Sequence, residues 1–231
     1  MTTMIAPELD FRIEGAEPVA FAAAPLLALK LAISCRGDQA IHSILLRCQV
    51  QIEATRRTYR PAEQEKMSDL FGPPADWDRT LRNLLWTHAS VSVPGFVGRT
   101  LVDLHLPCSY DFHVATTKYL DALGDGDIPL CVLFTGTIFY AANDRLLQVA
   151  QIPWDREATY RVPQSVWREV IERHFPNSAW LSLSKETFDR LHEFKRHNGF
   201  VTFEQAVEAL LSSVGDQPAA VDDCNQPVIH G

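Results

Sequence analysis

Four side chains near the middle of the chain combine imidazole and carboxylate chemistry: Asp103, His105, Asp111 and His113. Neutral imidazole and carboxylate groups both bind divalent metal ions, and a histidine beside a carboxylate can transfer a proton near neutral pH. Together they form a candidate metal site, which would suit a metal-binding protein or a metal-dependent enzyme. The alternative interpretation is that they form ordinary opposite-charge pairs on a solvated sheet face.

Two predicted strands would bring these side chains together. Residues 101–106 and 110–115 read as short strands around a three-residue turn, as in a β-hairpin. If Leu106 lies opposite Tyr110, each histidine faces one of the two aspartates across the hairpin. A shift of the register by one residue would separate them, so the candidate site depends on this pairing.

Other catalytic patterns are absent from the sequence. It contains no Gly-x-Ser-x-Gly elbow, glycine-rich phosphate loop, Gly-x-Gly-x-x-Gly pattern or His-Glu-x-x-His helix. Residues 105–108 have a compact His/Cys spacing, but the second ligand pair of a zinc site is missing. Residues 121–127 are acidic and glycine-rich, yet they lack the last ligand of a calcium loop and predict a tight turn. We therefore assign no catalytic residue and no cofactor, and a non-catalytic protein is the favoured interpretation.

Two alternating stretches near the N-terminus predict the centre of a β-sheet. Residues 27–35 and 40–52 alternate with a period of two on either side of a four-residue break, as in a long β-hairpin. Pairing Cys35 with Ala40 would place the apolar side chains of both strands on one face. Those side chains are Leu27, Leu29, Leu31, Ile33, Cys35, Ile44, Leu46, Cys48, Val50 and Ile52. The pattern predicts a large sheet with one buried side.

Further elements follow this predicted hairpin. Residues 61–72 predict a short helix that proline opens and glycine closes, and residues 86–93 predict a strand. Residues 128–141 are apolar on both faces, which indicates a covered central strand. Residues 146–152 can return beside it as an antiparallel neighbour.

The C-terminal part of the chain changes from β to helical periodicity. From Pro163 the apolar period is about 3.6, and Ser184 and Thr202 are predicted to cap two further helices. The predicted fold class is α+β, a mainly antiparallel β-sandwich followed by a small C-terminal helical unit. The predicted domains are a sandwich over residues 1–158, a helical subdomain over 159–213 and a flexible tail over 214–231.

Composition and charge exclude several classes of protein. The 231 residues are 46% hydrophobic and 22% charged, which is typical of a globular chain with a substantial core. The net charge of -8 disfavours a nucleic-acid-binding surface, and the run Arg56-Arg57 is too short to change that. The N-terminus lacks a signal-peptide pattern, and no apolar stretch of about 18 residues follows. We expect a cytoplasmic protein without membrane insertion.

Cysteine and tryptophan usage adds two expectations. Four of the five cysteines lie in or beside apolar runs, which predicts buried free thiols: Cys35, Cys48, Cys108 and Cys131. Most of the five tryptophans are expected in the core or at a domain junction, and exposed ones could anchor a partner. They are Trp77, Trp86, Trp154, Trp167 and Trp180.

Several turn and aromatic motifs resemble those of an uncharacterised bacterial family. The matching strings include Leu70-Phe71-Gly72, Pro107-Cys108-Ser109-Tyr110-Asp111, Phe134-Thr135-Gly136-Thr137 and Pro153-Trp154-Asp155, and the resemblance covers nearly the whole chain. Genes of this family often lie beside those for actinobacterial-type, high-affinity uptake nickel–iron hydrogenases. The resemblance implies an accessory role in hydrogenase assembly, maturation or electron-transfer organisation, and it assigns no catalytic residue.

Three functional hypotheses follow. The leading one is a non-catalytic interaction or assembly protein that presents an edge strand or aromatic patch to a protein partner, such as hydrogenase subunits or maturation factors. The second is a metal-binding protein or metal-dependent enzyme that uses the candidate metal site. The third is a self-assembling structural subunit, which would form a homo-oligomer.

Overall fold

The computed structural model describes residues 6–37, 39–108, 114–141, 146–178 and 181–215. The chain divides into two compact units, residues 1–179 and 180–231, and each is described by itself. The first unit extends beyond residue 158, the predicted end of the sandwich, and includes one of the predicted C-terminal helices.

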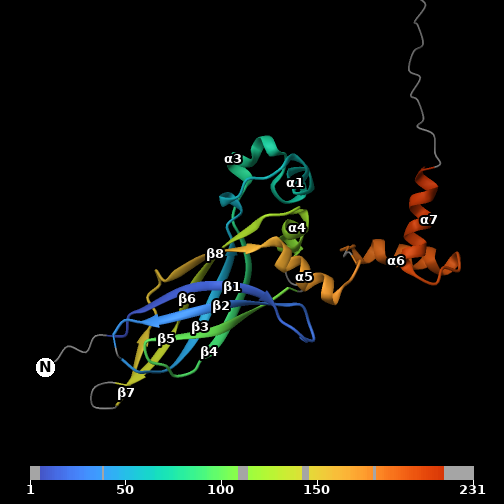
Figure 1. The fold of residues 1–231 in the computed structure, drawn as a ribbon. Helices are drawn as coiled ribbons and strands as arrows, with labels where there is room; N and C mark the ends of the chain where they lie inside the picture. The colour runs from blue at the N-terminus through green and yellow to red at the C-terminus, as the bar shows by residue number, and fades with distance from the viewer. Residues whose placement is uncertain (1–5, 38, 109–113, 142–145, 179–180, 216–231) are drawn as a thin grey trace, which may run out of the picture. The chain divides into compact units, whose positions relative to one another are not determined.

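The first unit is built on two antiparallel sheets (Figure 1). The three-stranded sheet consists, in spatial order, of β1 (Leu9–Pro18), β2 (Leu26–Cys35) and β5 (Arg99–Pro107). The five-stranded sheet has the order β4 (Leu84–Val93), β3 (Ile41–Ile52), β6 (Asp127–Ala141) and β7 (Leu147–Gln151), and β8 (Glu157–Pro163) also pairs with β6. At the margins of the sandwich, β1 lies near β8 and β4 lies near β5.

The apolar faces of the two sheets pack against each other. The inward side chains of β2 and β3 are almost completely buried. Phe11 of β1 stacks on Phe134 of β6, with their ring centroids 4.4 Å apart. The predicted fold class is confirmed: the protein is α+β, with an antiparallel sandwich as its main part.

The predicted hairpin between residues 27–35 and 40–52 is wrong, although both strands and both buried faces are confirmed. β2 pairs with β1 and β5, whereas β3 pairs with β4 and β6. The two consecutive strands therefore lie in different sheets, and their apolar faces meet across the core. Alternation determines which face of a strand is buried, but it does not determine the neighbouring strand.

The predicted central strand over 128–141 is confirmed as β6. Its first half pairs with β8 and its second half pairs with β7, while β3 runs along its other side. Gly136 lies where the neighbour changes. Its φ is 150°, and a Cβ at this position would lie 2.1 Å from the carbonyl oxygen of Leu45. Only glycine allows β3 and β6 to approach this closely here.

Short helical segments connect the strands of the first unit. Between β3 and β4 the chain forms η1 (Ala54–Arg56), α1 (Pro61–Lys66), α2 (Ser68–Phe71), η2 (Pro74–Asp76) and α3 (Trp77–Thr80). Helical structure over the predicted range 61–72 is confirmed, but as two short helices that are interrupted at Met67: proline opens the first, and Gly72, with φ 73°, closes the second. Later in the chain follow α4 (Val114–Ala122) and α5 (Gln164–His174). The predicted strand over 110–115 is wrong at its end, because Val114 and Ala115 begin α4.

The second unit contains α6 (Lys185–His197) and α7 (Phe203–Gly215). The two predicted caps are confirmed. Ser184 Oγ accepts a hydrogen bond from the backbone N–H of Thr187, and Thr202 Oγ1 accepts one from the N–H of Gln205. In the part of the chain that the structure describes, no helix is both long and apolar enough to cross a membrane.

Candidate functional site

Asp103 and His105 lie on the outer face of β5. In the register with β2, Asp103 is opposite Lys30 and His105 is opposite Ala28. Lys30 Nζ lies 2.9 Å from Asp103 Oδ1 and 2.6 Å from Glu17 Oε1 of β1. The hydrogen bonds to Glu17 and then Asp103 raise the pKa of Lys30. Asp103 is therefore part of an ion-pair ladder that crosses all strands of the three-stranded sheet.

The other two predicted ligands, Asp111 and His113, lie outside the described residues. The structure thus places two of the four candidates on one strand and does not place the other two. Among the side chains it does describe, no group of three or more His, Cys, Asp or Glu residues is arranged to hold a metal ion. The four-residue metal site stays a prediction.

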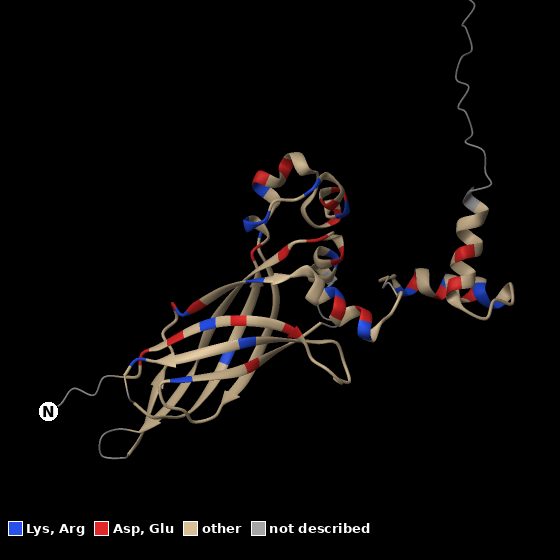
Figure 2. Ribbon diagram, viewed as in Figure 1, with Lys and Arg blue, Asp and Glu red and all other residues tan. Residues whose placement is uncertain are grey.

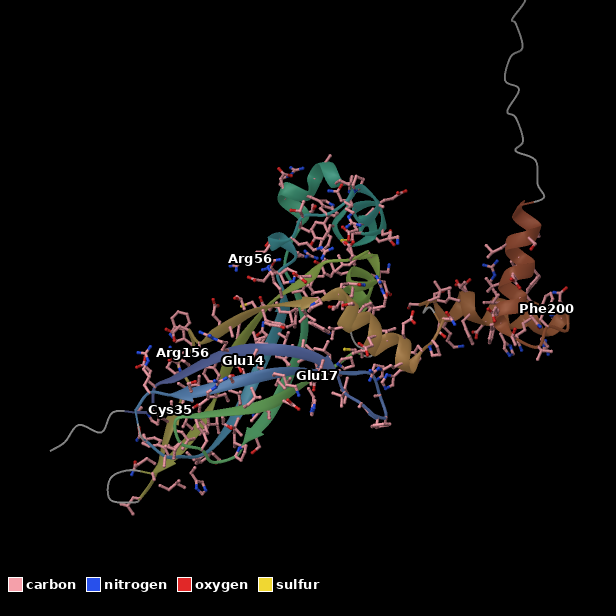
Figure 3. All side chains as sticks on the ribbon, viewed as in Figure 1. Glu14, Glu17, Cys35, Arg56, Arg156 and Phe200 are labelled. Atoms are coloured by element: carbon pink, nitrogen blue, oxygen red, sulfur yellow. The ribbon has the colours of Figure 1, made fainter. Side chains whose placement is uncertain are left out.

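Charged residues continue along the three-stranded sheet toward its opposite end (Figure 2), where Arg156 lies far from Glu17 (Figure 3), and they form further ion pairs. Arg99 Nη2 lies 2.5 Å from Glu14 Oε1, and Arg36 Nη1 lies 3.2 Å from Glu8 Oε2. Arg156 Nη2 also approaches Glu8, at 3.5 Å. Because most cations on this surface are already paired with carboxylates, it has little free positive charge to attract an anionic ligand.

A buried ion pair that the sequence analysis missed joins Arg57 and Glu63. Their side chains are only 9% and 6% exposed, and Arg57 Nη2 lies 2.9 Å from Glu63 Oε1. Glu63 also accepts hydrogen bonds from the backbone N–H groups of Arg60 and Gly124, both at 2.9 Å. Burial has the largest single influence and raises the pKa of Glu63. The two backbone hydrogen bonds and the Arg57 charge together outweigh burial and hold the pKa below its ordinary value.

This ion pair ties the excursion after β3 to the turn before β6. Arg57 donates to the carbonyl oxygens of Asp127 and Asp125, at 2.6 and 2.5 Å. Arg60 Nη2 lies 2.6 Å from Asp125 Oδ1. We call Arg57, Arg60, Glu63 and Asp125 the arginine clamp. Apart from the buried Arg57 Nε, which has no hydrogen-bond partner among the described residues, these groups bond to one another and to the backbone, so we interpret the clamp as structural. It holds the turn between α4 and β6, which lies within the predicted turn over 121–127.

The thiols are also structural. Cys35, Cys48, Cys108 and Cys131 are free and buried, as predicted. Burial raises the pKa of Cys48 and of Cys108 to about 12. Burial, followed by the negative charge of Glu157, raises the pKa of Cys131 to about 11. These groups stay protonated at neutral pH and are poor nucleophiles.

Three of the five tryptophans, Trp77, Trp86 and Trp167, are buried in the core as expected. Trp154 is almost fully exposed in the turn between β7 and β8. Trp180 lies outside the described residues. Trp154 is therefore the described tryptophan that is free to contact a partner.

The second unit packs its two helices around aromatic rings. The ring of Phe203 lies 5.3 Å from that of Phe188 and 6.1 Å from that of His192, measured between centroids. Lys195 Nζ lies 5.4 Å from the centroid of the Phe203 ring. Among the described residues of this unit, only Ala206 is fully buried. Two helices with so small a shared core leave most of their apolar side chains only half-buried, and Phe188, Leu210 and Leu211 are exposed.

One side of α7 combines an exposed leucine with two carboxylates. Leu211 is 67% exposed, and Glu204 and Glu208 precede it by seven and three residues, which places all three on one side of the helix. Among described residues neither carboxylate has an ion-pair partner. On α6, by contrast, Lys185 pairs with Asp189 at 2.7 Å. We call Glu204, Glu208 and Leu211 the α7 surface.

The fold defines a class: α+β proteins in which an antiparallel β-sandwich is followed by a separate pair of helices. Comparison with known protein families assigns the chain more specifically than this class does. The chain belongs to the family of unknown function DUF6084, whose model matches residues 6–219. This confirms that the chain belongs to an uncharacterised family, as the resemblance implied.

No curated protein matches the sequence. Solved structures with partial similarity include the β-glucosidase of Kluyveromyces marxianus, at 13% identity and TM-score 0.24 over 68% of this chain and 15% of that one. The putative ApaA protein of Bordetella pertussis matches at 11% identity and TM-score 0.24 over 68% of this chain and 95% of that one. β-Glucosidase 3B of Thermotoga neapolitana matches at 6% identity and TM-score 0.23, over 67% and 17%. The chain thus spans less than a fifth of either glucosidase.

Proposed function

We propose that this protein is a non-catalytic interaction or assembly protein whose second unit binds a protein partner through the α7 surface. The observation that carries the proposal is the small core of the second unit, in which Ala206 is the one fully buried residue among those described. Helical units of this size rarely reach full stability until another surface covers their apolar side. A binding partner would supply that surface.

The chemistry of the α7 surface selects the kind of partner. An amphipathic helix typically binds in an apolar groove of its target, where side chains three, four and seven residues apart act as anchors. Leu211 would be the apolar anchor, and the unpaired carboxylates of Glu204 and Glu208, on the same side of the helix, would meet basic side chains of the partner. The complementary partner is therefore a protein with an apolar groove flanked by lysine or arginine side chains.

The candidate partner comes from the family resemblance. The immature subunits or maturation factors of a nickel–iron uptake hydrogenase, in the cytoplasm, are the proteins that this resemblance favours. An accessory protein of this kind needs a binding surface and no catalytic residue, in keeping with the structural roles of the arginine clamp and the buried thiols.

The test is co-elution of the purified full chain with immature hydrogenase subunits in size-exclusion chromatography. We expect a complex with the unchanged protein and its loss in a Leu211→Glu variant, because a carboxylate in an apolar groove is unfavourable. The matched control is Leu101→Glu, which introduces the same charge at a 54% exposed position on β5. The control variant should still form the complex.

Repeated absence of a complex across redox states would contradict the hydrogenase partner, and equal binding by both variants would contradict the α7 surface. Metal analysis of protein purified without chelator tests the alternative function. Stoichiometric metal that a His105→Ala/His113→Ala variant loses would move the assignment to the candidate metal site.

A further inference from the structure

β7 is a free sheet edge of unusual composition. Its sequence, Leu147-Gln148-Val149-Ala150-Gln151, contains no charged residue and no proline. β7 pairs with β6 on one side, and among the described residues no strand pairs with its other side (Figure 1). Native proteins usually protect exposed edges with charges, prolines or bulges, because an open edge pairs readily with another strand. An unprotected edge indicates that another strand covers it.

The hydrogen-bond register shows which groups of β7 face outward. The N–H of Ile152 donates to the carbonyl oxygen of Gly136 at 3.0 Å. Bonded pairs alternate along an antiparallel ladder, so Gln148 and Ala150 also direct their backbone groups toward β6. The N–H and C=O groups of Leu147, Val149 and Gln151 therefore point away from the sheet.

This outward set is symmetric about Val149. If a second β7 approached in the antiparallel direction about a two-fold axis at Val149, each Val149 would face its copy. Leu147 of each chain would then face Gln151 of the other. All three outward residues would form bonded pairs, giving about six new backbone hydrogen bonds. Every residue of the two strands would then be either in a hydrogen-bonded pair or between two such pairs.

The outer face of the sheet matches the same symmetry. Val149, which is 56% exposed, lies opposite the half-buried Phe139 of β6. Exposed Leu45 of β3 lies one diagonal step from Phe139, because Leu45 is opposite Thr137. The two-fold pairing would bring the row of Leu45, Phe139 and Val149 next to the same row of the second copy. Apolar side chains would then continue across the axis without a charge between them.

We infer that the protein forms a two-fold symmetric dimer in which the β7 edges of two copies pair and join their five-stranded sheets into one. This interface involves a different surface from the α7 surface and does not depend on the proposed partner. A strand pair of this length buries a small area, so the dimer is concentration-dependent.

Sedimentation velocity of the full chain over a range of concentrations tests the inference. We expect a shift from monomer to dimer with rising concentration, and a Val149→Lys variant that stays monomeric, because two like charges would face each other at the axis. Circular dichroism should show an unchanged fold, since the side chain at position 149 is 56% exposed on the outer face of the sheet. The matched control is Leu101→Lys on β5, which should dimerise like the unchanged protein.

A cross-link checks the register itself. In a bonded antiparallel pair the Cα atoms lie about 5.5 Å apart, within the range that a disulfide spans. A Val149→Cys/Cys224→Ser variant should therefore form covalent dimers on mild oxidation. Ser92→Cys/Cys224→Ser, on an exposed position of β4, should not. A monomer at the highest soluble concentration, dimerisation of Val149→Lys, or equal cross-linking at both positions would overturn the inference.

Discussion

Glu63 shows how one buried carboxylate can fix a long excursion of the chain. It receives two backbone N–H groups and the Arg57 guanidinium within a nearly solvent-free site. A charge in such a site is tolerated because three hydrogen-bond donors, one of them cationic, are aimed at it. Removing it would leave Arg57 buried without a counter-ion.

We expect Glu63→Gln to lower the free energy of unfolding by about 3 kcal/mol, the usual scale for breaking a buried ion pair. Urea unfolding monitored by tryptophan fluorescence gives the measurement. Glu65→Gln, on the exposed side of the same helix, is the control and should change stability little. Equal stability of the two variants would show that the clamp contributes nothing to the fold.

The same residue predicts a pH dependence. The pKa of Glu63 is lower in the folded chain than in the unfolded chain, so its contribution is complete above the unfolded value of about 4.3 and is lost as the pH falls through the folded value. The stability gap between the unchanged protein and Glu63→Gln should stay constant from neutral pH to about 5 and close at lower pH. Urea titrations at a series of pH values measure it, and a gap that widens in acid would contradict the assignment.

At the scale of elements, the sequence predicted which face of a strand is buried better than it predicted which strands pair. The alternation in residues 27–35 and 40–52 correctly marked both buried faces, and the caps at Ser184 and Thr202 were predicted from local chemistry alone. The pairing of strands failed because it depends on tertiary contacts: β2 meets β5, and β3 meets β6, far along the chain. β1 and β8 alternate as well and were missed, so a longer search for period-two segments would have found them.

For the candidate site, too, the local structure could be predicted from the sequence, but the tertiary partners could not. Asp103 was correctly placed on a strand, but its observed partner is Lys30 of β2, which no local spacing could indicate. The arginine clamp had one local signal, a glutamate at the third position of a proline-opened helix, where it can cap the backbone N–H of Arg60. Its contacts with Asp125 and Asp127 required the folded chain.

The junction at Gly136 provides a prediction for β6. We expect Gly136→Ala to lower the free energy of unfolding by at least about 2 kcal/mol, because the added Cβ meets the Leu45 carbonyl and the residue holds an unfavourable φ. Thermal unfolding measures the effect. Gly15→Ala in β1 has room for its Cβ against the Lys30 side chain and serves as the control. Similar stability of both variants would contradict a close approach of β3 and β6.

At the scale of the whole molecule, the two compact units have different sources of stability. The first unit contains both sheets and the buried core, together with α5. The second unit has little core of its own. The family model spans both units, so the family is defined by the pair and not by the sandwich alone.

This division predicts that residues 1–179 fold without the second unit. We expect a chain truncated after residue 179 to keep its β-sheet circular dichroism and the unfolding midpoint of the full chain, because the core residues all lie before the cut. Differential scanning calorimetry of the two proteins gives the comparison. A truncated chain that aggregates or unfolds at a clearly lower temperature would show that the second unit stabilises the first.

The separation of β2 and β3 into different sheets also determines how fast the protein reaches its native state. Residue 26 pairs with residue 107, and residue 52 pairs with residue 130, so the β2–β5 and β3–β6 pairings must close long loops before either sheet is complete. Chains with such non-local contacts refold slowly, and their apolar strands stay open to association in the meantime. Newly made chains should therefore mature more completely at low temperature and low synthesis rate, when each has time to close its sheets before it meets another.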